Sequence, residues 1–226
     1  MLTPRRDSDS IKIHDLLLTV FLQDGAQWMR DAAVEQPISV SVCISHDVSP
    51  AARTDDLSLS LDYYVIANFL RNSIQNETFH GLRDVSRHIS SALADVLADF
   101  LDGLEVHVGV VQLRSPVHTR ALRFDYLATF RPDGSCIPKH IMHHVLDLSC
   151  PLIIGVDPQE RVYKQDVVVD LTIQSEGNGF DGEAIDLRLI TETLYDVSKL
   201  LPTAPHQSTI IVFYYPENYD LQLPNS

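Results

Sequence analysis

Apolar and polar residues alternate along several stretches of the chain, and this pattern predicts strands. From Ile11 to Phe21 the chain is rich in Ile, Leu and Val. In EQPISVSVCISHDV, which begins at Glu35, isoleucines and valines alternate with serines and Cys43. Successive side chains of a strand point to opposite faces, so this stretch predicts a strand with one buried face. Further along, LEVHVGVVQL and TRALRFDYLATF indicate a third and a fourth strand.

Apolar positions spaced by three and four residues predict two helices between the second and third strands. They run from Tyr64 to Ile74 and from Leu82 to Leu101. The order is therefore strand, strand, helix, helix, strand, strand. The next stretch, RPDGSCIPKH from Arg131 to His140, concentrates Pro, Gly and Ser and indicates a linker or a tight reversal.

After this stretch the beginning of the pattern returns. EQPISVSVCI at Glu35 is matched by KQDVVVDLTI at Lys164, and IHDLL at Ile13 is echoed by VLDLS at Val145. One helix pattern and the strand STIIVFYYPE follow, without a second long helix. An internal repeat of this kind predicts a duplication with a truncated second copy. The two predicted units are residues 10–130 and 141–226.

Composition limits the class of partner. The 226 residues include 17 basic and 31 acidic side chains, which give a formal charge of −14. That field repels phosphate and anionic lipid, so we expect neither nucleic acid nor a membrane surface as a partner. The three cysteines form no CxxC pattern, and no stretch reaches the roughly 18 apolar residues of a membrane helix. We therefore expect a cytoplasmic protein with reduced thiols.

The sequence KHIMHH raises the question of a metal site. On a strand, His140, Met142 and His144 would share one face while His143 points away. Only two ligands would then lie together, so we expect no metal here.

Three features together resemble the dihydroneopterin aldolase family. They are TDDLSLSLDY at the entrance of the first helix, GVDPQERVYKQ in the second unit, and the order of elements. Two copies in tandem resemble the front end of fungal folate-synthesis proteins. The resemblance implies an α+β fold of tandem T-fold units, each an antiparallel sheet backed by helices, in a homo-oligomer. It also implies a lyase that releases glycolaldehyde from 7,8-dihydroneopterin, a small-molecule substrate, with neither a metal nor a Schiff base.

The family's site residues fall on five positions of this chain. The tyrosine falls on Tyr63, and the hairpin glutamate falls on Asp31 in the first unit and on Glu160 in the second. The glutamate that holds the pterin falls on Arg83, whose guanidinium has donors only. The catalytic lysine falls on Gln112, and an amide is no base near neutral pH. We therefore expect feeble turnover of 7,8-dihydroneopterin.

Two more residues belong to the candidate site. Trp28, in the first hairpin, could stack on a flat ligand or cap the loop. His80 precedes the second helix and is placed at the edge of the pocket that Arg83 enters. The first unit keeps the tyrosine and the second keeps the longer acid, so Tyr63 and Glu160 are expected to share a composite pocket.

Three functions stay open at this point. The first is an aldolase-like lyase that acts on a pterin or a similar small cyclic substrate. The second is a relative recruited as a lyase, isomerase or cyclase for another ring system, in which Arg83 receives an anionic or carbonyl-bearing substrate. The third is a non-catalytic oligomerising module.

Overall fold

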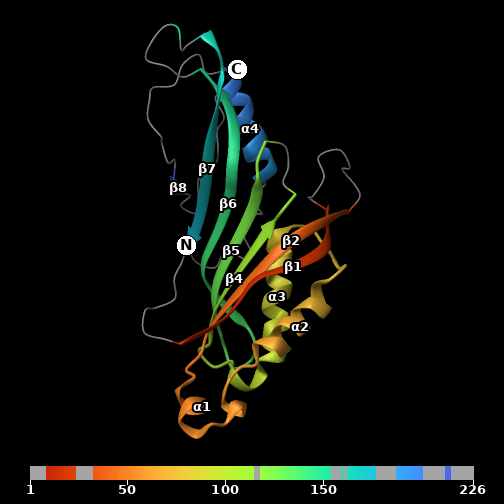
Figure 1. The fold of residues 1–226 in the computed structure, drawn as a ribbon, viewed down its shortest axis with the longest axis vertical. Helices are drawn as coiled ribbons and strands as arrows, with labels where there is room; N and C mark the ends of the chain where they lie inside the picture. The colour runs from red at the N-terminus through yellow and green to blue at the C-terminus, as the bar shows by residue number, and fades with distance from the viewer. Residues whose placement is uncertain are drawn as a thin grey trace.

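The computed structural model contains one continuous sheet with α2, α3 and α4 packed on a single face (Figure 1). It describes residues 9–23, 33–114, 118–153, 159, 162–176, 187–200 and 212–214. In this part of the chain, eight strands follow the order β3-β1-β2-β4-β5-β6-β7-β8 across the sheet. The α+β class expected from the sequence is confirmed.

The predicted order of elements agrees with the observed one. Up to residue 130 the chain forms β1 (Ser10–Leu22), β2 (Val34–Ser45), α1 (Ser49–Thr54), α2 (Tyr63–Ile74), β3 (Thr78–Phe79), α3 (Leu82–Val96), β4 (Glu105–Gln112) and β5 (Ala121–Phe130). After that it forms β6 (Cys136–Leu152), β7 (Gln165–Glu176), α4 (Leu187–Leu200) and β8 (Val212–Tyr214). Two short 3-10 turns, Leu57–Leu59 and Ala98–Phe100, flank the helices of the first half.

Helix α2 begins where the acidic turn supplies a cap. One carboxylate oxygen of Asp62 accepts from the backbone N–H of Tyr64 at 2.8 Å and of Val65 at 3.4 Å. These amides have no partner inside the helix, so the cap stabilises the first turn by about 1 kcal/mol. Spacings of four then place Ile66, Leu70 and Ile74 on the buried face. The helix entrance is thus set by local sequence.

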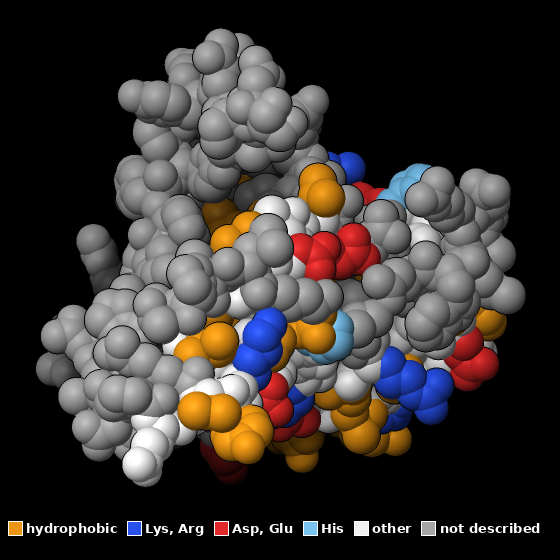
Figure 2. Space-filling model, turned by 90° about the horizontal axis from the view of Figure 1, so that it is seen from above, with side chains coloured by type: hydrophobic (Ala, Val, Ile, Leu, Met, Phe, Trp, Pro, Cys, Tyr) orange, Lys and Arg blue, Asp and Glu red, His pale blue; other side chains and the backbone are white. Residues whose placement is uncertain are grey.

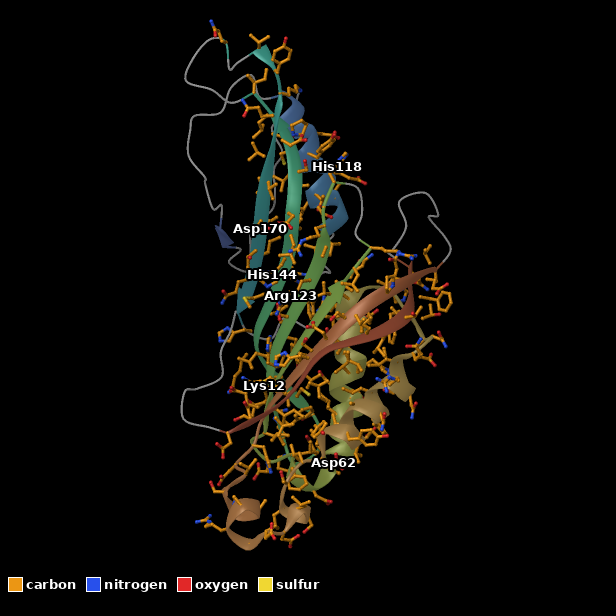
Figure 3. All side chains as sticks on the ribbon, in the orientation of Figure 1. Lys12, Asp62, His118, Arg123, His144 and Asp170 are labelled. Atoms are coloured by element: carbon orange, nitrogen blue, oxygen red, sulfur yellow. The ribbon has the colours of Figure 1, made fainter. Side chains whose placement is uncertain are left out.

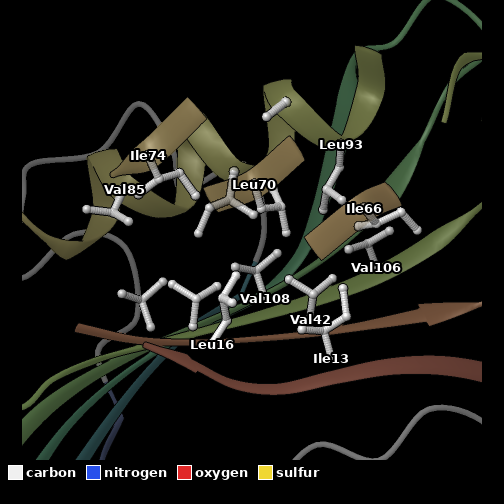
Figure 4. Close-up of a cluster of buried hydrophobic side chains, with 14 of the residues drawn as sticks. Ile13, Leu16, Val42, Ile66, Leu70, Ile74, Val85, Leu93, Val106 and Val108 are labelled. Carbon is white, nitrogen blue, oxygen red and sulfur yellow. The ribbon is translucent and has the colours of Figure 1, made fainter. Parts of the chain in front are cut away.

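The main core lies between the helices and one face of the sheet (Figure 4). The alternating positions of β2 and β4 point into it, as the sequence predicted. Each aliphatic side chain buried there contributes about 1.5–3 kcal/mol. The side chains labelled in Figure 4 are Ile13, Leu16, Val42, Ile66, Leu70, Ile74, Val85, Leu93, Val106 and Val108.

The two halves carry the same irregularity in their first hairpin. The register of β1 against β2 shifts between Ile13 and Leu16, and that of β6 against β7 shifts between Val145 and Leu148. The intervening Asp15 and Asp147 both have φ 52°, which is unusual for residues other than glycine.

The backbone N–H of each bulge residue is bound in the same way. That of Asp15 donates to the Ser41 hydroxyl at 3.2 Å, and that of Asp147 donates to an Asp170 carboxylate oxygen at 2.8 Å. Ser41 and Asp170 occupy equivalent places in the repeated sequence. This agreement supports the predicted duplication into tandem units, which stays a prediction.

The second half departs from the first in the direction of its last described strand. β4 pairs with β2 in antiparallel orientation, whereas β8 pairs with β7 in parallel. Between β2 and β4 the chain forms α1, α2, the short strand β3 and α3, but the structure describes one helix, α4, between β7 and β8. A connection with a single helix brings the chain back to the end of the sheet where β7 begins. The next strand, β8, therefore runs parallel to β7.

The predicted linker is only partly right. Residues 131–135 form a tight reversal, in which Gly134 N–H donates to the carbonyl of Arg131 at 3.0 Å. Residues 136–140, however, already belong to β6 and pair with β5. Pro138 is tolerated because the β5–β6 register shifts beside it, between Leu127 and Ala128. The sheet therefore continues from one half into the other, and the unit boundaries 10–130 and 141–226 stay a proposal.

Candidate functional site

Three of the residues expected at the site lie outside the described part of the chain. They are Trp28, Asp31 and Glu160. The composite pocket of Tyr63 and Glu160 therefore stays a prediction.

Tyr63 is the first residue of α2 and presents its ring to the surface. Its side chain is 65% exposed, beside the equally exposed Tyr64. The Asp62 cap fixes the backbone at this point. An exposed, well-anchored phenol is suited to contact another molecule or another subunit.

Arg83 lies in the first turn of α3, the helix that the sequence predicted to begin at Leu82. Its neighbour Leu82 packs against all three apolar clusters of the core, including the two built around β5 and β6. After burial, the charge of Arg83 contributes to lowering the pKa of His143 on β6. Arg83 therefore comes from the first half of the chain, next to a residue that packs against the β5–β6 pair, where the halves meet.

His143 lies on β6, in the second half of the chain. It is 9% exposed, and its ring lies edge-on to Phe124, with ring centroids 4.9 Å apart. Burial, then the charges of Arg83 and His144, lower its pKa to about 4. At neutral pH the imidazole is therefore uncharged, with one donor and one acceptor nitrogen.

Gln112 and His80 differ sharply in exposure. Gln112 ends β4 on the face that carries the helices, is 4% exposed, and donates from Nε2 to the carbonyl of Arg114 at 3.0 Å. His80 is exposed and precedes Gly81, the residue at which α3 begins. The structure therefore buries Gln112 and leaves His80 at the surface.

A second polar cluster, absent from the sequence-based prediction, lies on the opposite face of the sheet (Figure 3). Its centre is the carboxylate of Asp125 on β5, which is only 2% exposed. Arg123 donates to it from Nε at 2.5 Å and from Nη2 at 2.7 Å. Nε2 of His107 lies 2.9 Å from one carboxylate oxygen, and Nε2 of His144 lies 3.1 Å from the other.

Two neighbours complete the surroundings of Asp125. Nδ1 of His144 lies 2.9 Å from the hydroxyl of Thr172 on β7, so the cluster extends over four strands. Gly109 on β4 leaves the space that the carboxylate needs, because a Cβ there would come within 3.0 Å of its oxygen. Burial alone would raise the pKa of Asp125, but the donors from His107, His144 and Arg123 outweigh it and hold the pKa far below its ordinary value.

The donors around the carboxylate of Asp125 determine the chemistry that is available to the cluster. Both carboxylate oxygens are occupied by charged or ring N–H donors, so Asp125 is not available as a base. It instead ties strands of the first half, β4 and β5, to strands of the second half, β6 and β7.

Sequence reasoning missed this cluster because it indicated the strands that carry these residues but not which strands pair. The signal was present: Arg123 and Asp125 interrupt an otherwise apolar stretch with the spacing of one strand face. His107 likewise interrupts the apolar residues of β4. As expected, His144 and His143 point to opposite faces of β6. In the described part, no three His, Cys, Asp or Glu side chains converge as a metal-binding set.

No family model matches the chain. A curated relative, the folic acid synthesis protein fol1 of Pneumocystis carinii, is 27% identical over 168 residues, which cover 74% of this chain. The resemblance to a fungal folate-synthesis protein that the sequence predicted is thereby confirmed. The match spans 21% of the length of fol1, so fol1's full activity does not transfer.

Solved structures add information on the fold. A uricase from Bacillus fastidious superposes with a TM-score of 0.50 at 10% identity, covering 74% of this chain and 62% of the uricase. The dihydroneopterin aldolase of E. coli, solved with neopterin, superposes with a TM-score of 0.42 at 19% identity, covering 50% of this chain and 92% of the aldolase. The match to the uricase supports a common fold over most of this chain, and no more than the fold. None of the described helices of this chain has the length and hydrophobicity needed to cross a membrane.

Proposed function

We propose that the chain is a lyase of the dihydroneopterin aldolase type that acts on a pterin or a similar small cyclic substrate. The relationship to a folic acid synthesis protein supports this class of substrate. This similarity, which covers 74% of the chain, is the observation that carries the proposal.

The reaction sets clear requirements for the residues. Breaking a carbon–carbon bond next to an imine-like ring needs a base for the side-chain hydroxyl and stabilisation of the enamine that results. Tyr63 and the carboxylates of Asp31 and Glu160 are the proposed acid–base groups. Gln112 supplies an amide where the family has a lysine, so proton transfer is expected to be slow. No metal or Schiff base is required by this scheme.

A second candidate is favoured by Arg83. A guanidinium cannot accept the amino and ring N–H donors that a glutamate would hold. It can donate to a carbonyl or an anion. The chain would then be a recruited lyase, isomerase or cyclase whose ring substrate carries such a group.

Polyanions do not fit the surface seen at one end of the molecule. Figure 2 shows basic side chains beside acidic and apolar ones there, rather than gathered into a patch. Together with the formal charge of −14, this arrangement supports a small-molecule substrate.

The test is turnover of 7,8-dihydroneopterin, measured as glycolaldehyde release. Loss of a positioned base costs roughly 10²–10⁴-fold in rate, so we expect slow release rather than none. Complete absence of release, with no pterin binding, would remove the lyase proposal. Release faster than about 1 s⁻¹, ordinary for an enzyme, would show that Gln112 does not stand where the base is needed.

The composite pocket is tested in the same assay. The variants Tyr63→Phe and Glu160→Gln are measured singly and together. If the two residues serve one site, the double variant loses little beyond either single one. Losses that add would place them in separate sites.

A further inference from the structure

The polar cluster around Asp125 contains an imidazole with one nitrogen left for chemistry. Nε2 of His107 lies 2.9 Å from Oδ1 of Asp125, and an ionised carboxylate only accepts hydrogen bonds. The proton of the neutral ring is therefore on Nε2, and Nδ1 keeps its lone pair. Within the described residues Nδ1 has no hydrogen-bond partner, and it is not one of the fully buried atoms. The side chain is 16% exposed, so a small molecule at the surface can reach Nδ1.

The second imidazole of the cluster has no free nitrogen of this kind. Nε2 of His144 lies 3.1 Å from Oδ2 of Asp125, and its Nδ1 lies 2.9 Å from the hydroxyl of Thr172. Both nitrogens of His144 are thus engaged by protein groups, so this ring only holds the cluster together. The same carboxylate orients His107 and stabilises the imidazolium that forms when Nδ1 takes up a proton, as the aspartate of a catalytic triad does.

A guanidinium stands beside this base. Arg123 donates to Oδ1 of Asp125 from Nη2 at 2.7 Å, and Oδ1 is also the atom that His107 contacts. In the described part of the chain the hydrogen bonds of Arg123 go to Asp125 alone, and its side chain is 31% exposed. The N–H groups of Nη1 are therefore left for a ligand. Gly109 keeps the place clear, because a Cβ there would lie 3.0 Å from Oδ1 and 3.5 Å from Nη2.

We propose that His107 and Arg123 form a second acid–base site, which enolises small uncharged carbonyl compounds on the face of the sheet opposite the helices. Nδ1 of His107 takes a proton from the carbon next to the carbonyl. The electron pair of the broken C–H bond moves onto the carbonyl oxygen, to which Arg123 donates. The proton then returns from Nδ1 to the same carbon or to another carbon of the enolate, so the net reaction is exchange or isomerisation and consumes no co-reactant. This site uses no residue of the proposed lyase.

The groups of the site favour this class of compound. Removal of a proton next to a carbonyl needs a base and a donor at the oxygen where negative charge develops. The charge of Arg123 is already balanced by Asp125, so an anion gains less here than at an unpaired guanidinium. A carboxylate would also bring its lone pairs against Nδ1 of His107, which only accepts in the neutral ring.

The test is hydrogen–deuterium exchange of cyclohexanone by the full chain in D2O at neutral pH. It is followed as the loss of the ¹H NMR signal of the protons next to the carbonyl. A positioned base contributes roughly 10²–10⁴-fold in rate. We therefore expect the chain to exceed free imidazole at the same concentration by about 100-fold or more. A rate no higher than that of free imidazole overturns the proposal.

Three variants assign the activity to residues. His107→Gln, whose amide can still donate to Asp125, should exchange no faster than free imidazole. Arg123→Lys keeps the charge beside Asp125 but loses the planar fork of donors, so the rate should fall about tenfold or more. His14→Phe is the matched control, because it removes an exposed imidazole of β1, and it should keep the wild-type rate.

The results of these variants decide whether the roles stand. An undiminished rate in a folded His107→Gln variant overturns the role of His107, and an equal loss in His14→Phe reduces the activity to that of any surface imidazole. An undiminished rate in Arg123→Lys removes Arg123 from the site. Should His107→Gln not fold, His107→Asn replaces it.

Glycolaldehyde release, measured on the same proteins, keeps this inference apart from the proposed function. Exchange that depends on His107, without any release, leaves the second site standing and removes the lyase. Release without exchange above that of free imidazole leaves the lyase standing and removes the second site. Loss of both activities in His107→Gln would mean one shared site and overturn the inference.

Discussion

At the scale of single residues, the charge of a buried carboxylate depends on the donors around it. Asp125 keeps its charge because Arg123 and His107 donate to it and Nε2 of His144 lies 3.1 Å from its carboxylate. The sign of its linkage follows from the lowered pKa. Its stabilising effect is present above the unfolded pKa, near 3.9, and is lost only as pH falls through the much lower folded pKa. The cluster should therefore survive mild acid.

Replacing Asp125 tests the strength of the cluster. Asp125→Asn leaves the guanidinium of Arg123 without its counter-charge, and breaking a largely buried pair in this way costs about 3 kcal/mol. We expect the free energy of unfolding in urea to fall by that amount at pH 7. Asp166→Asn, at an exposed position of β7, should change it by less than about 0.5 kcal/mol. Equal stability of the two variants would contradict the role assigned to the cluster.

His143 gives a pH dependence of the same sign in a higher pH range. The unfolded chain takes up a proton near pH 6.5, whereas the folded chain does so only at about 4. The free energy of unfolding should therefore decline by about 3 kcal/mol as pH falls from 6.5 to 4. His143→Phe should remove this part of the decline, while the exposed His14→Phe should retain it. Denaturation curves measured over this pH range test the prediction. Parallel profiles of stability against pH for the wild-type chain and both variants would refute the lowered pKa of His143.

At the scale of elements, short local signals set where a helix begins, and connections set how strands run. The cap at Asp62 belongs to the first kind. The parallel β8 belongs to the second, since only one described helix, α4, lies between β7 and β8, whereas α1, α2 and α3 lie between β2 and β4. One substitution can change a local signal such as the start of a helix. It cannot change the direction of a strand, which the whole connection sets.

The cap predicts a modest, local effect. Asp62→Ala removes the acceptor for the backbone N–H groups of Tyr64 and Val65 and should lower stability by about 1 kcal/mol. Asn72→Ala, on an exposed turn of the same helix, should have little effect or a slightly favourable one. Thermal denaturation of both variants provides the measurement. A cap variant as stable as the wild-type chain would mean that packing alone holds the helix entrance.

At the scale of the whole molecule, both edges of the sheet are largely open within the described residues. β3 pairs only with Phe21 and Leu22 of β1, and β8 pairs only with residues 172–174 of β7. Leu17 on β1 and Val168 on β7 are 66% and 62% exposed. Open edges with apolar side chains favour strand pairing with another chain.

We therefore predict a homo-oligomer joined through these edges. Sedimentation at micromolar concentration should give a mass that is a multiple of 25.4 kDa. Val168→Lys places a charge on the β7 edge and should weaken association, whereas Val197→Lys, at an exposed position of α4, should not. A monomer at this concentration would contradict the prediction.

The sequence by itself determined the features that depend on neighbours in the chain. Alternation in β2 and β4, the three-four spacing of α2 and the cap at Asp62 are local, so their positions could be predicted. The repeat at Glu35 and Lys164 could also be read directly. Pro138 misled the linker prediction, because a strand irregularity that accepts a proline is set by pairing with β5.

Only the tertiary structure decided which side chains meet. Arg123 and Asp125 come from one strand, but His107 and His144 reach them from strands on either side. Likewise, Leu82 of α3 packs against the apolar clusters around β5 and β6, which lie far from it in the sequence. Residue spacing fixes the face on which a side chain lies. Its partner on that face depends on strand order and register, which follow from the packing of the whole sheet.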